Sequence, residues 1–192
     1  MNLKSKEEEE IIAYVRSMED EIVYKVIFLG EPAVGKTSLI KKYIDKNYEE
    51  RYIPTIGVSI TKKQVEYAGK KFTIMFWDIA GQPQFYLLHK VYYNGANGVV
   101  LIFDLTRSHT LMNLKDWYKE LLKYQLDKVP IIIVGNKSDL KERAVLEPQM
   151  DHLAEQLGVT HTFMTSAKTG DNVDQIFKTM AELIYEQKRK LA

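Results

Sequence analysis

The sequence contains no cysteine among its 192 residues. This absence excludes disulfides, thiolate-bound metals, a thiol nucleophile and every lipid that is attached through cysteine. The sequence also has no long apolar run. A membrane-spanning helix needs about 18 uninterrupted apolar residues, and no stretch approaches this length. The first residues, MNLKSKEEEE, lack the apolar segment of a secretion signal, and Asn2 stands where myristoylation requires glycine. We therefore expect a cytoplasmic protein without an intrinsic lipid anchor.

The sequence also has little net charge, with 27 basic and 26 acidic side chains. Nucleic-acid-binding proteins need a clustered basic surface, so we expect no nucleic-acid partner. The acidic side chains are concentrated at the start, where residues 1–21 include seven acidic and three basic ones. Apolar residues recur there at helical spacing, at Ile11, Val15 and Met18. We predict that residues 1–21 form an acidic helical extension, which either docks onto a partner or is a solvated lead-in to a domain at 22–192.

From residue 22 onward, apolar segments alternate with amphipathic ones. Segments with the length and β-branched content of buried strands are 22–29, 99–104, 131–134 and 160–164. Segments with helical periodicity are 36–45, 110–126, 148–157 and 173–190. The strands expected at 57–67 and 71–78 are joined by a linker too short for a crossover helix, so they should form a hairpin. The pattern predicts an α/β fold: a six-stranded, mostly parallel sheet with one antiparallel edge strand and helices on both faces.

A phosphate-binding motif joins the first expected strand to the first expected helix. The sequence GEPAVGKT at residues 30–37 fits GxxxxGK[ST] in the strand–loop–helix context that this motif requires. Backbone N–H groups of such a loop converge on phosphate oxygens, and the helix adds its positive end. Lys36 can reach the outer phosphates, and Thr37 can offer its hydroxyl to Mg²⁺. The loop residues expected to bind the nucleotide are Gly30, Ala33, Val34, Gly35, Lys36, Thr37 and Ser38.

A second group of residues indicates which base is bound. Asn136, Lys137 and Asp139 follow the strand expected at 131–134, at the sheet edge where open α/β folds bind ligands. The Asp139 carboxylate can accept both N1–H and the 2-amino group of guanine, and adenine presents no such pair. Another loop, after the strand expected at 160–164, can bring backbone N–H groups to the guanine carbonyl. Its residues are Ser166, Ala167 and Lys168.

Together these motifs resemble the Ras superfamily of small GTPases, and within it the Rab branch. The resemblance covers residues 24–188. It includes, in family order, the phosphate loop, YIPTIG at 52–57, WDIAGQ at 77–82, NKSD at 136–139 and SAK at 166–168. YYNGA at 92–96 and LIFDLT at 101–106 are similar to stretches more particular to Rab proteins. The resemblance implies the G domain fold of P-loop NTPases over 22–192, and a switch that binds GDP or GTP with Mg²⁺ and hydrolyses GTP.

The resemblance also implies a metal site and a switch. Thr37 and Thr55 would offer hydroxyls to Mg²⁺, and Asp78 would hold the metal through water. The N–H of Gly81 would contact the terminal phosphate. Loss of that phosphate would release Thr55 and Gly81 together, which is how the two loops would signal the bound nucleotide.

Catalytic and base-stacking roles follow from the same resemblance. Gln82 would orient the attacking water, and Lys36 would stabilise charge during phosphoryl transfer. Tyr48 would stack on guanine, and the aliphatic stem of Lys137 would pack near the base. The residues with implied catalytic roles are Gln82, Lys36, Gly81 and Thr55.

The expected partners are an exchange factor, a GTPase-activating protein and effectors, which would bind through residues 52–60 and 82–93 of a monomer. Trp77 and Tyr92 are either half-buried interface aromatics or core residues. Ile60 stands where Rab proteins commonly carry a phenylalanine that binds effectors. The C-terminal EQKRKLA contains no cysteine for a prenyl group, so membrane association would be indirect or depend on a tail absent from this chain.

Alternative functions stay open at this point. Pro32 lies close to where Gln82 and an incoming arginine must fit, so the chain could be a scaffold that holds its nucleotide with negligible turnover. A P-loop kinase or ATPase is a further alternative, but the NKSD motif at 136–139 and the SAK motif at 166–168 argue against it. An RNA-linked GTPase is the weakest, because the chain has neither an appended RNA-binding domain nor a basic stripe.

Overall fold

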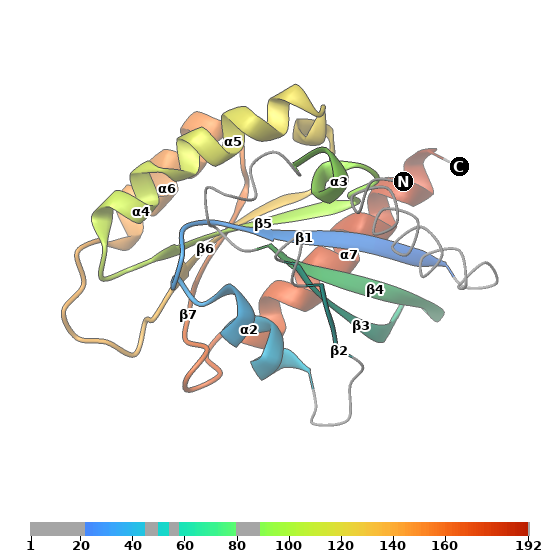
Figure 1. The fold of residues 1–192 in the computed structure, drawn as a ribbon, viewed down its shortest axis with the longest axis horizontal. Coiled ribbons are helices and arrows are strands. Elements are labelled where there is room, and N and C mark those ends of the chain that lie inside the picture. The colour runs from blue at the N-terminus through green and yellow to red at the C-terminus, as the bar shows by residue number, and fades with distance from the viewer. Residues whose placement is uncertain (1–21, 45–49, 54–57, 80–88, 192) are drawn as a thin grey trace, which may run out of the picture.

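A computed structural model describes residues 22–44, 50–53, 58–79 and 89–191; the acidic segment 1–21 lies outside these ranges. One mixed sheet forms the centre of the molecule (Figure 1), with the strand order β2-β3-β4-β1-β5-β6-β7. The strands are β1 Val23–Leu29, β2 Glu50–Ile53, β3 Val58–Tyr67, β4 Lys70–Ile79, β5 Gly98–Asp104, β6 Ile131–Asn136 and β7 His161–Thr165. Strands β4, β1, β5, β6 and β7 are parallel to one another, and β3 is antiparallel to β4.

The predicted α/β fold with six strands, one of them antiparallel, is confirmed, and β2 adds a seventh strand. β2 pairs antiparallel with β3, from Ile53 opposite Val58 to Glu50 opposite Thr61. The antiparallel strand β3 therefore lies between β4 and β2, and β2 occupies the edge of the sheet. Its sequence, ERYI, is too short to show an alternating pattern, which is why the sequence did not predict it.

The hairpin predicted at 57–67 and 71–78 is formed by β3 and β4. Tyr67 pairs with Lys70, so Ala68 and Gly69 alone make the turn. Both turn residues have positive φ, 51° at Ala68 and 73° at Gly69. Two central residues with positive φ are typical of the type I′ turn, whose twist matches that of the flanking strands.

The helices cover both faces of the sheet. They are α2 Lys36–Tyr43, α3 His89–Tyr93, α4 Ser108–Met112, α5 Leu114–Lys123, α6 Glu147–Leu157 and α7 Val173–Leu191, and a 3₁₀ turn spans Leu126–Lys128. The single helix predicted over 110–126 is two helices, which meet at Asn113. Asn113 directs its amide to the Glu31 carboxylate of the phosphate loop, at 3.2 Å. The break between α4 and α5 therefore lies where Asn113 contacts the phosphate loop.

Alternate residues of the strands pack on opposite faces of the sheet. On β1, Ile27 and Leu29 join the core beneath α3, α4, α5 and α6, whereas Val26 and Phe28 join the core beneath α2 and α7. All four of these side chains are buried. Burial on both faces explains why the inner strands read as continuous apolar runs.

The short helix α3 is held by a lysine from β1. Lys25 Nζ donates to the carbonyl oxygens of Val91, at 3.1 Å, and of Asn94, at 3.0 Å, near the end of α3. It also lies 3.6 Å from the centroid of the Trp77 ring. Burial lowers the pKa of Lys25 to about 7. Side-chain donors that bind the last carbonyl groups of a helix stabilise its C-terminus, so these hydrogen bonds hold α3 against the sheet.

Trp77 and Tyr92 are core residues rather than half-buried interface aromatics. Their exposed fractions are 2% and 0%, and Ile60 beside them on the neighbouring strand is 1% exposed. All three belong to the core beneath α3 to α6. A partner that binds this region therefore meets other side chains than these three.

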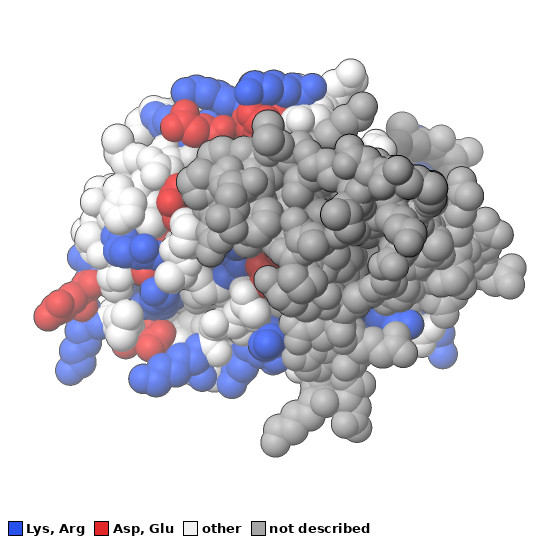
Figure 2. All heavy atoms as spheres, viewed as in Figure 1, with Lys and Arg blue, Asp and Glu red and all other residues white. Residues whose placement is uncertain are grey.

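Charged side chains of both signs are interspersed on the described part of the face in Figure 2. Among the described helices, none combines the length and apolar character needed to cross a membrane.

Candidate functional site

The phosphate loop leaves β1 and enters α2 through residues whose backbone favours glycine. Gly30 and Gly35 have φ values of +143° and +104°. A Cβ at Gly30 would lie 2.1 Å from the backbone oxygen of Ile102, and one at Gly35 would lie 2.2 Å from Asn136 Nδ2. The two glycines therefore let the loop pass close to β5 and β6, as a loop that wraps an anion requires.

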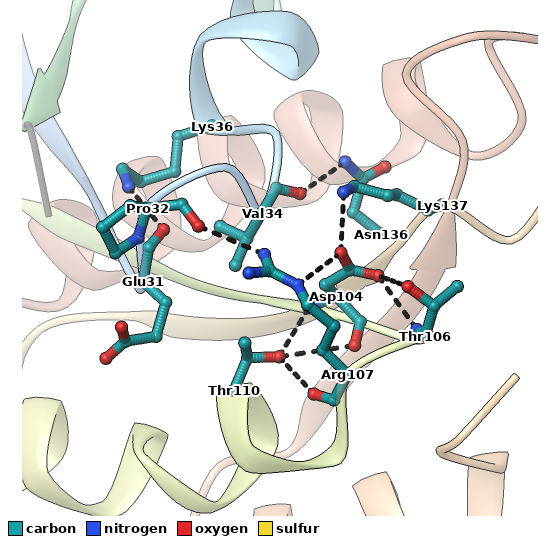
Figure 3. A network of polar contacts seen from close by, with 10 residues as sticks. All are labelled: Glu31, Pro32, Val34, Lys36, Asp104, Thr106, Arg107, Thr110, Asn136 and Lys137. Carbon is teal, nitrogen blue, oxygen red and sulfur yellow. Dashed lines mark hydrogen bonds and ion pairs between the residues drawn. The ribbon is translucent and has the colours of Figure 1, made fainter.

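Lys36 points into this loop. Its side chain is buried, and its Nζ donates to the carbonyl oxygen of Gly30 at 2.8 Å. It also donates to the carbonyl oxygen of Glu31 at 3.0 Å (Figure 3). Burial lowers the pKa of Lys36, whereas the charges of Asp78 and Glu31 act in the opposite direction. The loop thus holds a largely desolvated ammonium group, and such a group interacts strongly with phosphate oxygens.

Thr37 and Asp78 bring two oxygen ligands together beside the loop. The Thr37 hydroxyl, at the start of α2, donates a hydrogen bond to Asp78 Oδ2, at the end of β4. Mg²⁺ prefers hard oxygen ligands and is usually bound by one or two protein groups together with phosphates and water. One hydroxyl and one carboxylate fit this pattern. The described ranges hold no group of three or more His, Asp or Glu side chains that could bind a metal by themselves.

Asn136 connects the phosphate loop to the loop after β7. Its Nδ2 donates to the Val34 carbonyl at 2.9 Å, and its Oδ1 accepts from the Ala167 N–H at 3.2 Å. Thr165 adds a hydroxyl to the same oxygen at 3.3 Å. Since Asn136 is only 2% exposed, these hydrogen bonds form in the interior. Three segments distant in the sequence are therefore held in one geometry.

Asp139 is held by a neighbouring loop and presents a carboxylate to solvent. Ser166 donates its hydroxyl to Asp139 Oδ1 at 2.6 Å. This hydrogen bond lowers the pKa of Asp139, so the group is ionised at neutral pH. An ionised carboxylate accepts hydrogen bonds only, which suits two adjacent N–H donors of a base.

Asp104, at the end of β5, is a site residue that the motifs did not single out. Its side chain is 1% exposed, and its Oδ2 lies 2.6 Å from Lys137 Nζ and 2.9 Å from Arg107 Nε. Thr106 donates to its Oδ1 through the backbone N–H and the hydroxyl, at 2.9 and 2.7 Å. Burial opposes ionisation, but the hydrogen bonds from Lys137, Thr106 and Arg107 outweigh it and lower the pKa of Asp104 to about 2.

This lowered pKa makes stability depend on pH in the acid range. A carboxylate whose pKa is lower in the folded chain stabilises it above the unfolded value and loses that contribution as pH falls. We expect Asp104→Asn to lower the free energy of unfolding by about 2 kcal/mol at pH 6. The difference from wild type should shrink by about 1 kcal/mol at pH 3, because the unfolded chain is then protonated at this position. Urea unfolding of both proteins at the two pH values measures it, and a difference independent of pH contradicts it.

Most of the predicted site residues that the structure describes lie at one cleft of about 700 Å³, whereas Asp78 does not line it and contacts Thr37, which does. This volume is within the range of about 300–1,000 Å³ that is common for small-molecule sites. The cleft is lined by Ala33, Gly35, Lys36, Thr37, Ser38, Asn136, Lys137, Asp139, Leu140, Ala167 and Lys168. All of these were predicted except Leu140. The predicted residues Gly30, Val34 and Ser166 stand behind the lining and hold Lys36, Asn136 and Asp139 by hydrogen bonds.

Four of the predicted site residues lie outside the described ranges. They are Tyr48, Thr55, Gly81 and Gln82. Their roles stay predictions.

Comparison with known proteins gives the family. Residues 25–186 match the Ras family. The chain belongs to this family. It is 37% identical over 165 residues to Ras-related protein SEC4 of Saccharomyces cerevisiae, covering 86% of the chain and 76% of SEC4. It is 38% identical over 171 residues to Ras-related protein RABD2a of Arabidopsis thaliana, covering 88% and 83%. It is 36% identical over 164 residues to human Ras-related protein Rab-21, covering 85% and 72%.

These matches confirm the resemblance to small GTPases of the Rab type. Members of the Ras family hydrolyse GTP, and the chain is a GTP hydrolase of this family. The sequence contains no cysteine, so it offers none for prenylation. The cleft that joins the phosphate loop to the residues predicted to read the base lies within the matched segment.

Proposed function

We propose that this Ras-family chain is a Rab-like switch that binds GDP and GTP with Mg²⁺, hydrolyses GTP slowly and engages effectors in its GTP state. The observation that carries this proposal is the single cleft shared by Lys36 of the phosphate loop and Asp139 of the base motif. A nucleotide that reaches both residues presents phosphates to an ammonium group and guanine donors to a carboxylate. The site residues act in the roles given above, with Thr37, Thr55 and Asp78 as the metal-holding set.

Hydrolysis in this proposal depends on orientation and charge. Lys36 binds the outer phosphates, and Gln82 orients a water molecule for attack on the terminal phosphorus. The N–H of Gly81 donates to an oxygen of the terminal phosphate, and Tyr48 covers the base. Bound Mg²⁺ neutralises charge on the phosphate oxygens. Release of phosphate removes the contacts of Thr55 and Gly81, and the two segments that carry them change together.

The proposed partners are an exchange factor, a GTPase-activating protein and effectors that bind residues 52–60 and 82–93. Because Ile60 and Tyr92 are buried, the contacts come from other side chains of these ranges. We propose a monomeric, cytoplasmic protein that serves membrane trafficking, reaches membranes indirectly and carries its acidic extension at 1–21 ahead of the G domain at 22–192. A pull-down that compares Gln82→Leu loaded with GTP against wild type loaded with GDP would identify effectors.

Single-turnover hydrolysis tests the switch against the nucleotide-locked scaffold. The chain is loaded with GTP and freed of unbound nucleotide, and the bound nucleotide is then separated and measured over time. A switch converts its GTP to GDP and phosphate within hours, at a rate that Gln82→Leu reduces. GTP that stays intact for days in the wild-type chain contradicts the proposal and favours the scaffold.

Pro32 gives a separate prediction about hydrolysis. The backbone carbonyl of Pro32 accepts a hydrogen bond from Arg107, and glycine at this position keeps that carbonyl. Pro32→Gly should therefore change GDP affinity less than about threefold, whereas removal of the ring should raise the stimulated hydrolysis rate at least about tenfold. Single-turnover rates with a GTPase-activating protein, together with equilibrium GDP binding, measure both quantities. Equal effects on the rate and the affinity, or no effect on either, would refute this role of Pro32.

A further inference from the structure

A buried carboxylate lies between the phosphate loop and the base-reading motif. Oδ2 of Asp104 contacts two cationic side chains, Lys137 at 2.6 Å and Arg107 at 2.9 Å. Lys137 belongs to the base motif and lines the cleft. Arg107 belongs to neither motif and does not line the cleft. The contact between Asp104 and Lys137 therefore gives Arg107 an indirect connection to the base site.

Arg107 also reaches the phosphate loop. Its Nη2 donates to the carbonyl oxygen of Pro32 at 3.1 Å, although the two residues are far apart in the sequence. Figure 3 shows the guanidinium group between the Asp104 carboxylate and the loop. One side chain therefore contacts the loop directly and, through a single carboxylate oxygen, the base motif. Asn113 adds a second contact between the same region and the loop, through Glu31.

The backbone that carries Arg107 is fixed in the interior. The Thr110 hydroxyl donates to the Arg107 carbonyl at 2.7 Å and accepts from the Asp104 N–H at 3.0 Å. Thr110 is fully buried. Thr110 therefore holds the backbone of Arg107, and the contacts with Asp104 and Pro32 hold its guanidinium group. A planar guanidinium can serve two acceptors at once, which a lysine ammonium cannot do in the same geometry.

We propose that Arg107 is a positioning residue for nucleotide retention, which couples the Pro32 wall of the phosphate loop to Lys137 of the base site through Asp104. The inference rests on the proposed function, because it concerns release of the guanine nucleotide. Arg107 acts through other residues, because it does not line the cleft and its Nε and Nη2 are engaged by Asp104 and Pro32. Release requires the loop and the base site to separate from the ligand, and this bridge opposes that separation.

Nucleotide dissociation from the full chain tests the proposal. Wild type and Arg107→Ala are loaded with a fluorescent GDP analogue in the presence of Mg²⁺ and chased with excess GDP. We expect Arg107→Ala to release the analogue about tenfold faster than wild type, because the loss of one charge-assisted hydrogen bond has an effect of this size. Arg107→Lys, which can pair with Asp104 but cannot serve both acceptors in the same way, should release it about threefold faster than wild type.

A control removes an exposed ion pair with the same sequence spacing elsewhere. Arg189 lies 2.7 Å from Glu186 near the end of α7, also at a spacing of three residues. Arg189→Ala should release the analogue within about twofold of the wild-type rate, because exposed pairs contribute little. The association rate of the analogue should also change less than about twofold in Arg107→Ala, so that the loss of affinity appears in the dissociation rate.

The outcomes separate the possibilities. An unchanged dissociation rate in Arg107→Ala overturns the inference. So does a reduced hydrolysis rate with unchanged dissociation, which would make Arg107 a catalytic residue. If Arg107→Ala does not fold, Arg107→Lys decides, and release at the wild-type rate overturns the proposal. Wild-type protein that does not bind the GDP analogue at all would contradict the proposed function itself.

Discussion

Asp139→Asn should bind GDP about 100-fold more weakly than the wild-type chain and should prefer xanthosine diphosphate. In the wild type, an ionised carboxylate held by Ser166 faces the cleft and can accept two N–H donors of guanine. An asparagine amide keeps one acceptor and turns the other position into a donor. Xanthine presents N1–H beside a carbonyl oxygen at position 2, which matches an acceptor next to a donor. The substitution should therefore exchange one base preference for the other.

Competition against a fluorescent GDP analogue measures both affinities. Asp116→Asn is the matched control, because Asp116 is an exposed carboxylate of α5 whose contact is the exposed Lys119. This control should keep the wild-type preference for GDP. If Asp139→Asn keeps the wild-type ratio of GDP to xanthosine diphosphate affinity, Asp139 does not read the base.

Lys36→Met should reduce GDP affinity at least about 100-fold, since two charge-assisted contacts with phosphate are each worth about 1.5–3 kcal/mol. The ammonium is buried and already positioned by the carbonyl oxygens of Gly30 and Glu31, so little ordering is needed when a phosphate binds. Methionine keeps the apolar stem that packs in the loop and removes the charge. Equilibrium binding of GDP in the presence of Mg²⁺ measures the loss.

Lys42→Met provides the control on the same helix. Lys42 is an exposed residue in the last turn of α2, and its substitution should change GDP affinity less than about twofold. The ratio of GDP to xanthosine diphosphate affinity should be unchanged in Lys36→Met, because Lys36 contacts phosphate rather than the base. A wild-type affinity in Lys36→Met, or a changed ratio, would refute the assignment of Lys36 to the phosphates.

Most of the sheet could be predicted because its strands are buried on both faces. The β-branched runs around Val26, Val100 and Ile133 indicate such strands without any knowledge of their partners. The segments that sequence reasoning missed depend on distant contacts. β2 exists through its pairing with β3, and α3 is held by Lys25 from β1. Five residues with the sequence HKVYY carry no helical periodicity, so only the folded chain shows that they form a helix.

The residues that line the cleft could be predicted from local sequence motifs, whereas the hydrogen-bond network that supports them could not. Lys36 and Asp139 belong to motifs in which the spacing of neighbours specifies the chemistry. Asp104 was visible only as part of a Rab-like stretch, although a carboxylate at the end of an apolar strand is itself a signal for a site at that sheet edge. Its connection to Pro32 depends on Arg107, whose backbone is held by Thr110 only in the folded chain.

In the proposed function, one cleft binds both a guanine base and a phosphate chain. Titration calorimetry of the nucleotide-free chain with GDP and with ADP, at the same Mg²⁺ concentration, tests this. Both ligands offer the same diphosphate to Lys36, so any difference comes from the base. We expect GDP to bind at least about 1,000-fold more tightly, as for a site whose charged acceptor is left without donors by the wrong base. Equal affinities for GDP and ADP would contradict the claim.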